Sequence, residues 1–259
     1  MDAPRYSCAV VTGASSGIGK ELVTLLAGEC GTLVLVARRT DLLQKLANVI
    51  TGQCRVEIFP WDLEPQDAAA QLWASLQTRG LSPDLWVNDA GFGAFGSLSN
   101  VPLNRELAMV DLNVLALMRL TKMAAEHMLR NGGGTILNVA SLVAFQPTPR
   151  MAVYGASKAF VLSYTQALDS ELRSLGVRVL ALCPGNTTTA FHTVAGTTRV
   201  RAMHRITAMP PRQVAQCALL QIHRGTPVVV PGFLNRLASI AAGVLPRSWV
   251  VAIASRLMV

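Results

Sequence analysis

Short apolar runs alternate with amphipathic segments along most of the chain. Several of the runs are apolar at successive positions, as expected of strands in a parallel sheet that is buried on both faces. The segments between them repeat apolar residues at the spacing of a helix. Seven strands are predicted, at residues 7–11, 33–37, 55–59, 85–88, 136–140, 177–182 and 227–230.

Helices are expected between these strands, and the clearest lie at about residues 66–79, 103–128 and 154–175. A further helix should begin at Pro210 and Pro211, since proline is favoured at helix starts. Asn113 falls in the middle of the second of these helices, where asparagine is unfavourable. It either bends the helix around a water molecule or satisfies a neighbouring carbonyl group.

Strands that alternate with helices predict an α/β protein with one doubly wound parallel sheet. The expected strand order is 3-2-1-4-5-6-7, with right-handed crossovers. The sequence shows no internal repeat, linker or low-complexity tract, so residues 1–259 are expected to form a single domain.

The end of the chain, residues 233–259, is strongly apolar even for a protein that is 51% hydrophobic. Its two apolar segments, 233–245 and 249–258, are interrupted at Pro246, and neither reaches the ~20 residues that a membrane span needs. Such helices require a partner, which is the protein's own core, a second subunit or a membrane surface. We favour burial against a second subunit over contact with a membrane.

The balance of 23 basic and 15 acidic residues gives a net charge of +8. This charge suits an anionic ligand such as a dinucleotide, a nucleic acid or a membrane surface. Nucleic acid is the weaker interpretation, because the sequence contains no run of five or six basic residues.

The cysteines are scattered, with no CxxC pair and no histidine at ligand spacing, so no metal site is predicted. They are typical of buried small hydrophobic residues in a reducing compartment. The chain enters a strand almost at once, without the pattern of a secretion signal, and we expect a cytoplasmic protein. The five residues are Cys8, Cys30, Cys54, Cys183 and Cys217.

A glycine-rich loop, TGASSGIG at residues 12–19, lies between the first strand and the first helix. Gly13 allows the tight turn, Gly17 allows the backbone to approach a pyrophosphate, and Gly19 allows the helix to pack close to the strand. A glycine pattern alone is weak evidence, but this setting favours a Rossmann-type fold that binds a dinucleotide at the helix N-terminus.

Arg38 and Arg39 follow the second strand directly, at the place where an acidic residue would indicate NAD. A guanidinium group suits the 2′-phosphate of NADP(H), so we favour NADP(H) over NAD; the alternative is a solvated strand exit. Asp41 is interpreted as a cap of the next helix. Asp62, at the exit of the third strand, either contacts the adenine amino group or caps a helix.

The segment Tyr154-Gly-Ala-Ser-Lys158 places a phenol and an ammonium group one helical turn apart. A cation beside the phenol would lower the tyrosine pKa from about 10 towards the range useful for proton transfer. Ser141 follows the fifth strand and offers a hydroxyl to a substrate oxygen that Tyr154 protonates. A YxxxK pentad also occurs by chance, and a serine that closes a strand is commoner still.

Several motifs occur together and in order: TGASSGIG (12–19), NDAG (88–91), Asn113, Ser141, YGASK (154–158) and PG (184–185). With this set the chain resembles the short-chain dehydrogenase/reductase family, in its compact branch, over about residues 7–190. The YxxxK spacing differs from that of the enoyl-reductase branch, and the length differs from that of the sugar-nucleotide epimerases. The family usually has NNAG where this chain has NDAG, and Val or Ile at the position of Thr187.

The resemblance implies that this chain transfers hydride between a nicotinamide and a carbonyl or alcohol carbon, with catalytic residues Asn113, Ser141, Tyr154 and Lys158. Tyr154 would be the general acid/base, and Ser141 would hold the substrate oxygen. Lys158 would lower the tyrosine pKa and hold the nicotinamide ribose, while Asn113 would anchor a water that relays protons. The implied cofactor residues are Gly13, Ser15, Ser16, Gly17, Ile18, Gly19, Arg38, Arg39, Asp62, Leu63, Asn88, Ala90, Gly91, Tyr154, Lys158, Pro184, Gly185, Thr187 and Thr189.

The walls of the substrate pocket are expected from residues 92–95 and 142–145 and from a lid at about 186–209. The first two are apolar, which favours a hydrophobic ketone, aldehyde or 3-oxoacyl chain. Arginines on the lid either contact an anionic handle, such as the phosphate of an acyl carrier arm, or are merely solvated. These residues are Arg199, Arg201 and Arg205.

The family commonly forms oligomers, so a homodimer or homotetramer is expected. One alternative is a dinucleotide-binding sensor or scaffold without activity, since the fold can outlive its chemistry. The complete catalytic set argues against it. Another alternative is a reductase that associates with a membrane surface through its tail and acts on lipid substrates.

Overall fold

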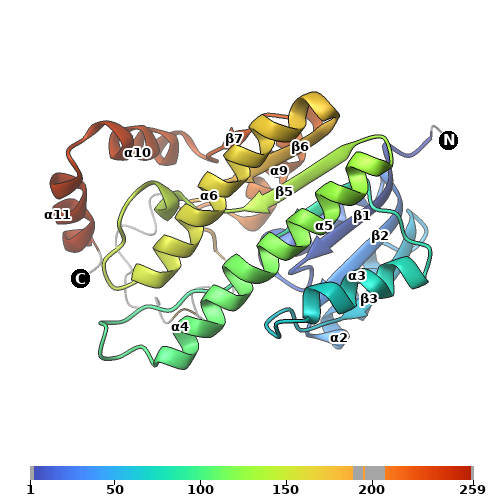
Figure 1. Cartoon of the computed structure of the whole chain (residues 1–259), viewed down its shortest axis with the longest axis horizontal. Helices are drawn as coiled ribbons and strands as arrows, with labels where there is room; N and C mark the ends of the chain where they lie inside the picture. The colour runs from blue at the N-terminus through green and yellow to red at the C-terminus, as the bar shows by residue number, and fades with distance from the viewer. Residues whose placement is uncertain (1–2, 189–194, 196–207, 258–259) are drawn as a thin grey trace.

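A parallel sheet of seven strands, ordered β3-β2-β1-β4-β5-β6-β7, runs through the middle of the molecule (Figure 1). The structure is a computed structural model that describes residues 3–188, 195 and 208–257. The predicted fold class and strand order are confirmed. The strands are β1 (Tyr6–Thr12), β2 (Cys30–Ala37), β3 (Arg55–Pro60), β4 (Leu85–Asn88), β5 (Gly134–Val139), β6 (Val177–Leu182) and β7 (Val228–Val229).

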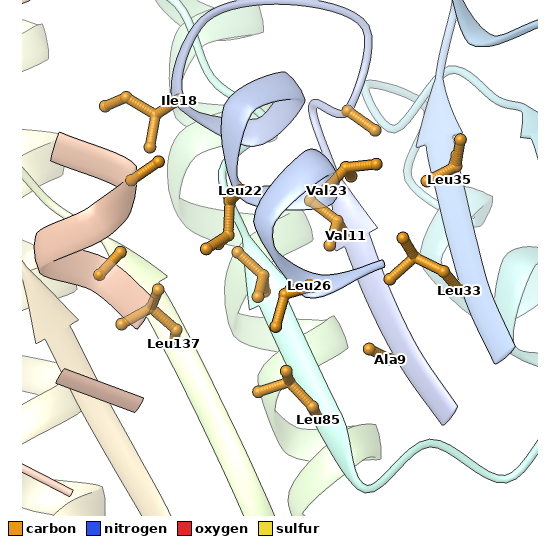
Figure 2. Packing of buried hydrophobic residues seen from close by; sticks show 14 of the residues in the cluster. Ala9, Val11, Ile18, Leu22, Val23, Leu26, Leu33, Leu35, Leu85 and Leu137 are labelled. Atoms are coloured by element: carbon orange, nitrogen blue, oxygen red, sulfur yellow. The ribbon is translucent and has the colours of Figure 1, made fainter. Parts of the chain in front are cut away.

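Helices cover both faces of this sheet (Figure 1). The first group is α1 (Gly17–Leu26), α2 (Thr40–Val49) and α9 (Pro211–Arg224), and the second is α3 (Ala68–Thr78), α5 (Leu117–Arg130) and α6 (Ala152–Leu172). Alternate strand residues feed the two cores: Val11 packs with the first group and Val10 with the second. Figure 2 shows the first core, where Leu22, Val23 and Leu26 of α1 lie on strand residues of β1, β2, β4 and β5.

The helical stretch predicted at 103–128 is present but not uniform. It consists of α4 (Leu103–Val110), a π-helical turn at Asp111–Ala116 and then α5. Asn113 lies in the π-helical turn, where the helix is locally widened.

Some predicted boundaries need correction. The helix α2 begins at Thr40 with Arg39 in the capping position, so Asp41 lies in the first turn and is not the cap. Its carboxylate still favours the positive end of the helix dipole. The helix α3 begins two residues later than predicted, because Asp67 precedes it as the N-cap. The α6 helix ends at Leu172, and a 3₁₀ turn at Arg173–Leu175 continues it.

The chain ends in α10 (Phe233–Val244) and α11 (Arg247–Leu257), which lie at the end of the molecule away from α2 and β3 (Figure 1). Within the residues that the structure describes, no helix is both long enough and apolar enough to cross a bilayer. The carboxyl ends of β1, β4, β5 and β6 meet at one edge of the sheet, and the loops that follow them carry most of the predicted site residues.

Candidate active site

The structure brings Tyr154 and Ser141 together at the edge of the sheet. Ser141 lies two residues after the end of β5 and caps a 3₁₀ turn (η2, Leu142–Phe145), where its hydroxyl oxygen accepts a hydrogen bond from the Val143 N–H at 3.4 Å. Tyr154 lies in the first turn of α6 and is 8% exposed. The Ser141 hydroxyl lies close enough to Tyr154 for hydrogen bonding to act on the tyrosine pKa.

Burial dominates the titration of Tyr154 and raises its pKa to about 12, while the hydrogen bond with Ser141 acts to lower it. The expected lowering of this pKa by Lys158 is not found. The Nζ atom of Lys158 donates to the backbone oxygen of Val139 at 2.7 Å and lies 6.0 Å from the centre of the Tyr154 ring. The YxxxK spacing therefore places the Lys158 ammonium group near Tyr154, but the group points to the Val139 carbonyl and not to the phenol hydroxyl.

Lys158 is itself perturbed, because burial lowers its pKa to about 8. The nearby Asp89 and Cys183 act in the opposite direction on the lysine pKa. Burial also raises the pKa of Asp89 to about 7, while a hydrogen bond from the Gly19 N–H and the charge of Lys158 lower it. The site thus holds a lysine and a carboxyl group that both titrate near neutral pH.

Asn113 connects the π-helical turn to the loop after β4. Its amide group accepts from the Phe92 N–H at 3.1 Å and donates to the Phe92 oxygen at 2.9 Å and to the Ser157 hydroxyl at 3.2 Å. The side chain therefore satisfies a neighbouring carbonyl, one of the two roles considered for it. A Cβ atom on Gly91 would lie 2.8 Å from the Asn113 Oδ1 atom, so only glycine fits there.

Apolar side chains surround Tyr154. Ala94, Met109 and Met151 are buried with it, and partly buried side chains from both predicted pocket walls pack against them. The wall residues are Phe92, Phe95 and Val143, and Val101 and Val153 also pack there.

The glycine-rich loop packs closely against the loop after β4. Gly13 has a φ of 71°, and a Cβ atom there would lie 2.9 Å from the Ala90 nitrogen. A Cβ atom on Gly19 would lie 2.7 Å from the Asp89 carboxylate, which accepts the Gly19 N–H at 2.8 Å. The helix α1 has no acidic residue in its first turn, and Ser16 provides no side-chain cap, so its N-terminus suits an anion.

Arg39 lies beside this loop, as expected for a residue that recognises a phosphate. Its Nη2 atom donates to the hydroxyl groups of Ser15 and Ser16, both at 2.9 Å. A guanidinium group and two hydroxyls at a helix N-terminus are chemically matched to a phosphate group. Arg38 points elsewhere and forms an ion pair with Glu64 at 2.9 Å.

Comparison with known proteins agrees with this geometry. The family model described as short chain dehydrogenase matches residues 7–199, about three-quarters of the sequence. The chain belongs to the short-chain dehydrogenase family.

Relatives within this family carry several activities and cofactors. Ketoacyl reductase HetN of a Nostoc species is 31% identical over 222 residues, which cover 85% of this chain and 77% of the relative. A short-chain dehydrogenase from Sphingobium yanoikuyae in complex with NADPH is 29% identical with a TM-score of 0.79, covering 96% of this chain and 93% of that one. A 3-ketoacyl-(acyl-carrier-protein) reductase from Brucella melitensis complexed with NADH is 28% identical with a TM-score of 0.75, covering 86% and 94%.

Not every residue that the short-chain dehydrogenase resemblance implied presents its side chain to a cofactor. Asn88 is buried, accepts from the Trp86 ring nitrogen at 2.8 Å and donates to Thr121 at 3.0 Å and Asn138 at 2.8 Å. Asn138 in turn donates to Thr165 of α6 at 3.0 Å. Any cofactor contact of Asn88 is thus limited to its backbone, because its side chain belongs to this buried polar network.

Leu63 and Ile18 are likewise core residues, at 5% and 9% exposure. Asp62 is exposed, and its carboxylate accepts the Glu64 N–H at 3.2 Å. It therefore shapes a turn after β3 and does not cap α3, whose N-cap is Asp67. Its position at the sheet edge leaves the expected adenine contact as a prediction.

The segment after β6 lies beside Ser141. The Pro184 oxygen accepts from the Leu142 N–H at 2.8 Å and from the Ser141 hydroxyl at 3.5 Å. Thr187 donates to the Gly185 oxygen at 3.2 Å, which tightens the turn. Thr189, most of the predicted lid and its arginines (Arg199, Arg201 and Arg205) lie outside the described residues.

The role of Asp89 was missed by the sequence argument. The sequence showed that NDAG replaces the NNAG usual in this family, which marks the position. It did not show that the carboxylate lies between the glycine-rich loop and the charge of Lys158.

Proposed function

We propose that this chain is an NADP(H)-dependent oxidoreductase that transfers hydride between the nicotinamide and a carbonyl or secondary alcohol of a hydrophobic substrate. The observation that carries the proposal is the placement of Ser141 beside Tyr154, which lies within a cluster of apolar side chains. This arrangement offers one oxygen-binding position in otherwise apolar surroundings.

In this reaction Tyr154 exchanges a proton with the substrate oxygen, and Ser141 donates a hydrogen bond that fixes the oxygen beside it. The nicotinamide supplies or accepts the hydride when it is bound. Lys158 provides a buried positive charge one turn along α6, where it would bind ribose hydroxyls. Asn113 holds the loop at Phe92 through two hydrogen bonds and joins it to α6 through a third, to the Ser157 hydroxyl.

The preference for NADP(H) is supported by Arg39 with Ser15 and Ser16. Arg38 would have to exchange its ion pair with Glu64 for a phosphate contact, so Arg39 is the principal residue proposed for the 2′-phosphate. One related structure binds NADPH and another NADH, so the family alone does not determine the cofactor.

The proposed substrate class is a ketone, an aldehyde or a 3-oxoacyl chain with apolar substituents. The side chains of Phe92, Phe95 and Val143 near Tyr154 support it. Two relatives that are named as ketoacyl reductases favour the 3-oxoacyl group within this class. The lid arginines remain candidates for a carrier phosphate.

We further propose that residues 1–259 form a single domain, and that the protein is a homo-oligomer in the cytoplasm. All five cysteines are free thiols, and three are buried, which suits a reducing compartment.

The experiment that tests the function measures oxidation of NADPH and of NADH with a panel of apolar ketones, aldehydes and 3-oxoacyl thioesters. Tyr154→Phe removes the hydroxyl and is expected to lower kcat about a thousandfold, since a positioned acid/base contributes about 10²–10⁴-fold. Tyr164→Phe is the matched control, because Tyr164 lies on the same helix and stacks on Phe160. Equal activity of both variants would refute the assignment.

A further inference from the structure

The helix α10 has polar side chains on its buried side and apolar side chains on its exposed side, the reverse of a normal surface helix. Asn235 and Ser239 are buried, at 3% and 8% exposure, while Phe233, Ile240 and Val244 are 76%, 55% and 80% exposed. A surface helix normally turns its apolar stripe towards the core and its polar residues outward. Here the inward polar groups are satisfied by local carbonyls: Asn235 donates to Pro231 and Ser239 to Arg236.

The apolar surface extends to α11. Trp249 and Ile253 lie one turn apart and are 63% and 49% exposed, while Val250 and Ala254 are buried. Both helices occupy the same end of the molecule (Figure 1). We use the term tail surface for the outward apolar side chains of the two helices, which are Phe233, Leu234, Leu237, Ile240, Val244, Trp249 and Ile253.

The charges on the two helices all have one sign. All 15 acidic residues of the chain precede residue 172, so the last third contains none. The charged side chains of the two helices are Arg236, Arg247 and Arg256, and each residue is exposed. Arginine next to exposed Trp, Phe and Leu is the composition of helices that lie in a membrane interface.

We propose that the tail surface seats the protein on the surface of an anionic lipid bilayer. The aliphatic side chains, with Phe233 and Trp249, would enter the boundary between headgroups and acyl chains, and the three arginines would pair with acidic headgroups. A second copy fits less well. A two-fold dimer pairs the same patch with itself, which would place the three arginines near their own copies with no acidic residue in the tail to offset them.

The helix α10 also borders the site, through its buried side. Gly185, in the segment beside Ser141, packs so closely on Asn235 that a Cβ atom would overlap the asparagine amide. The helix α10 is thus fixed to the loop that follows β6. If the proposed function holds, the bilayer would lie next to the position where a hydrophobic carbonyl substrate is reduced, and membrane-dissolved substrates would reach it directly.

The test measures binding of the full chain to two kinds of vesicle by flotation, phosphatidylcholine alone and phosphatidylcholine mixed with phosphatidylserine. We expect about a hundredfold preference for the mixed vesicles, since each of three arginines near an anionic surface adds a factor of about five. High salt should reduce this preference, because it screens the headgroup charges.

Two triple variants separate the apolar and the charged contributions. Serine at Leu237, Ile240 and Trp249 should abolish binding to both kinds of vesicle; the control triple places serine at the exposed leucines Leu98, Leu103 and Leu107. Glutamine at Arg236, Arg247 and Arg256 should abolish the preference for the mixed vesicles. Its control lowers the net charge equally at Lys45, Lys122 and Arg130.

Equal binding of the tail and control variants would overturn the proposal. A second result would also overturn it: the wild-type protein binds neither kind of vesicle and is an oligomer, whereas the tail serine variant is a monomer. The tail surface would then bind a second copy. Failure of the catalytic proposal is distinguishable, because Tyr154→Phe should bind vesicles as wild type does. Vesicle binding without turnover would leave the tail surface intact and reject only the enzyme.

Discussion

Replacing Asp89 by asparagine measures how much the charged carboxylate beside the glycine-rich loop lowers the free energy of unfolding. The asparagine oxygen can still accept the Gly19 N–H hydrogen bond, which measures 2.8 Å in the wild-type chain. The substitution also restores the amide that the family usually carries at this position. The main physical change is therefore the loss of a titratable carboxyl group.

The magnitude follows from the pKa of Asp89, which burial raises from 3.8 to about 7. The folded protein therefore keeps a proton that the unfolded chain releases near pH 4, so stability falls as the pH rises from about 4 to about 7. Raising the pKa from 3.8 to about 7 lowers the free energy of unfolding by at most about 4 kcal/mol, since a tenfold change in proton affinity corresponds to about 1.4 kcal/mol. Since Asp89 is only partly buried by its surface area, we expect about 2–4 kcal/mol.

The assay is equilibrium urea unfolding of both proteins across that pH range, followed by tryptophan fluorescence. Asp89→Asn should gain stability over wild type as the pH rises, while carboxylates common to both proteins cancel in the difference. Asp41→Asn, at an exposed position in the first turn of α2, should show no such trend. A difference between wild type and Asp89→Asn that does not vary with pH would refute the reasoning.

Two further predictions concern the cofactor site. Arg39→Gln should lower kcat/KM for NADPH by about 10–100-fold, the value of charge-assisted hydrogen bonds, and leave NADH nearly unaffected; equal losses for both cofactors would contradict the 2′-phosphate assignment. Gly13→Ala should lower the free energy of unfolding by at least about 1 kcal/mol, because φ is 71° and the new Cβ atom would lie 2.9 Å from the Ala90 nitrogen. Gly28→Ala is the control, since nothing lies within 4 Å of its Cβ position, and equal changes in urea unfolding would reject the steric argument.

The sheet order could be predicted because each strand is an apolar run and its connections are helical, which leaves few arrangements of a parallel sheet. The grouping of Ser141 with Tyr154 was predictable too, because one follows a strand and the other opens the next helix. The spacing of Tyr154 and Lys158 was correct, but the direction of the lysine was not. A side chain with four rotatable bonds turns to the nearest acceptor, which here is the Val139 carbonyl.

Other features depend on contacts between distant residues and leave no local signal. The π-helical turn contains Asn113, whose side chain forms hydrogen bonds with Phe92 and Ser157. The Asn88 side chain can be buried because it forms hydrogen bonds with Thr121 and Asn138. In α10, the sequence showed a strongly apolar segment without showing on which side the core would lie. Only the three-dimensional arrangement reveals that most of its large apolar side chains point outward.

The buried polar network of Asn88, Asn138, Thr121 and Thr165 has a consequence for protein engineering. Its hydrogen bonds join β4, β5, α5 and α6 and set how far α6 lies along the sheet. A slide of one residue would leave several buried donors and acceptors unpaired, which is costly. The network therefore fixes the position of α6, the helix that carries Tyr154, along the sheet. The loops around the apolar cluster can be redesigned for new substrates without moving this tyrosine.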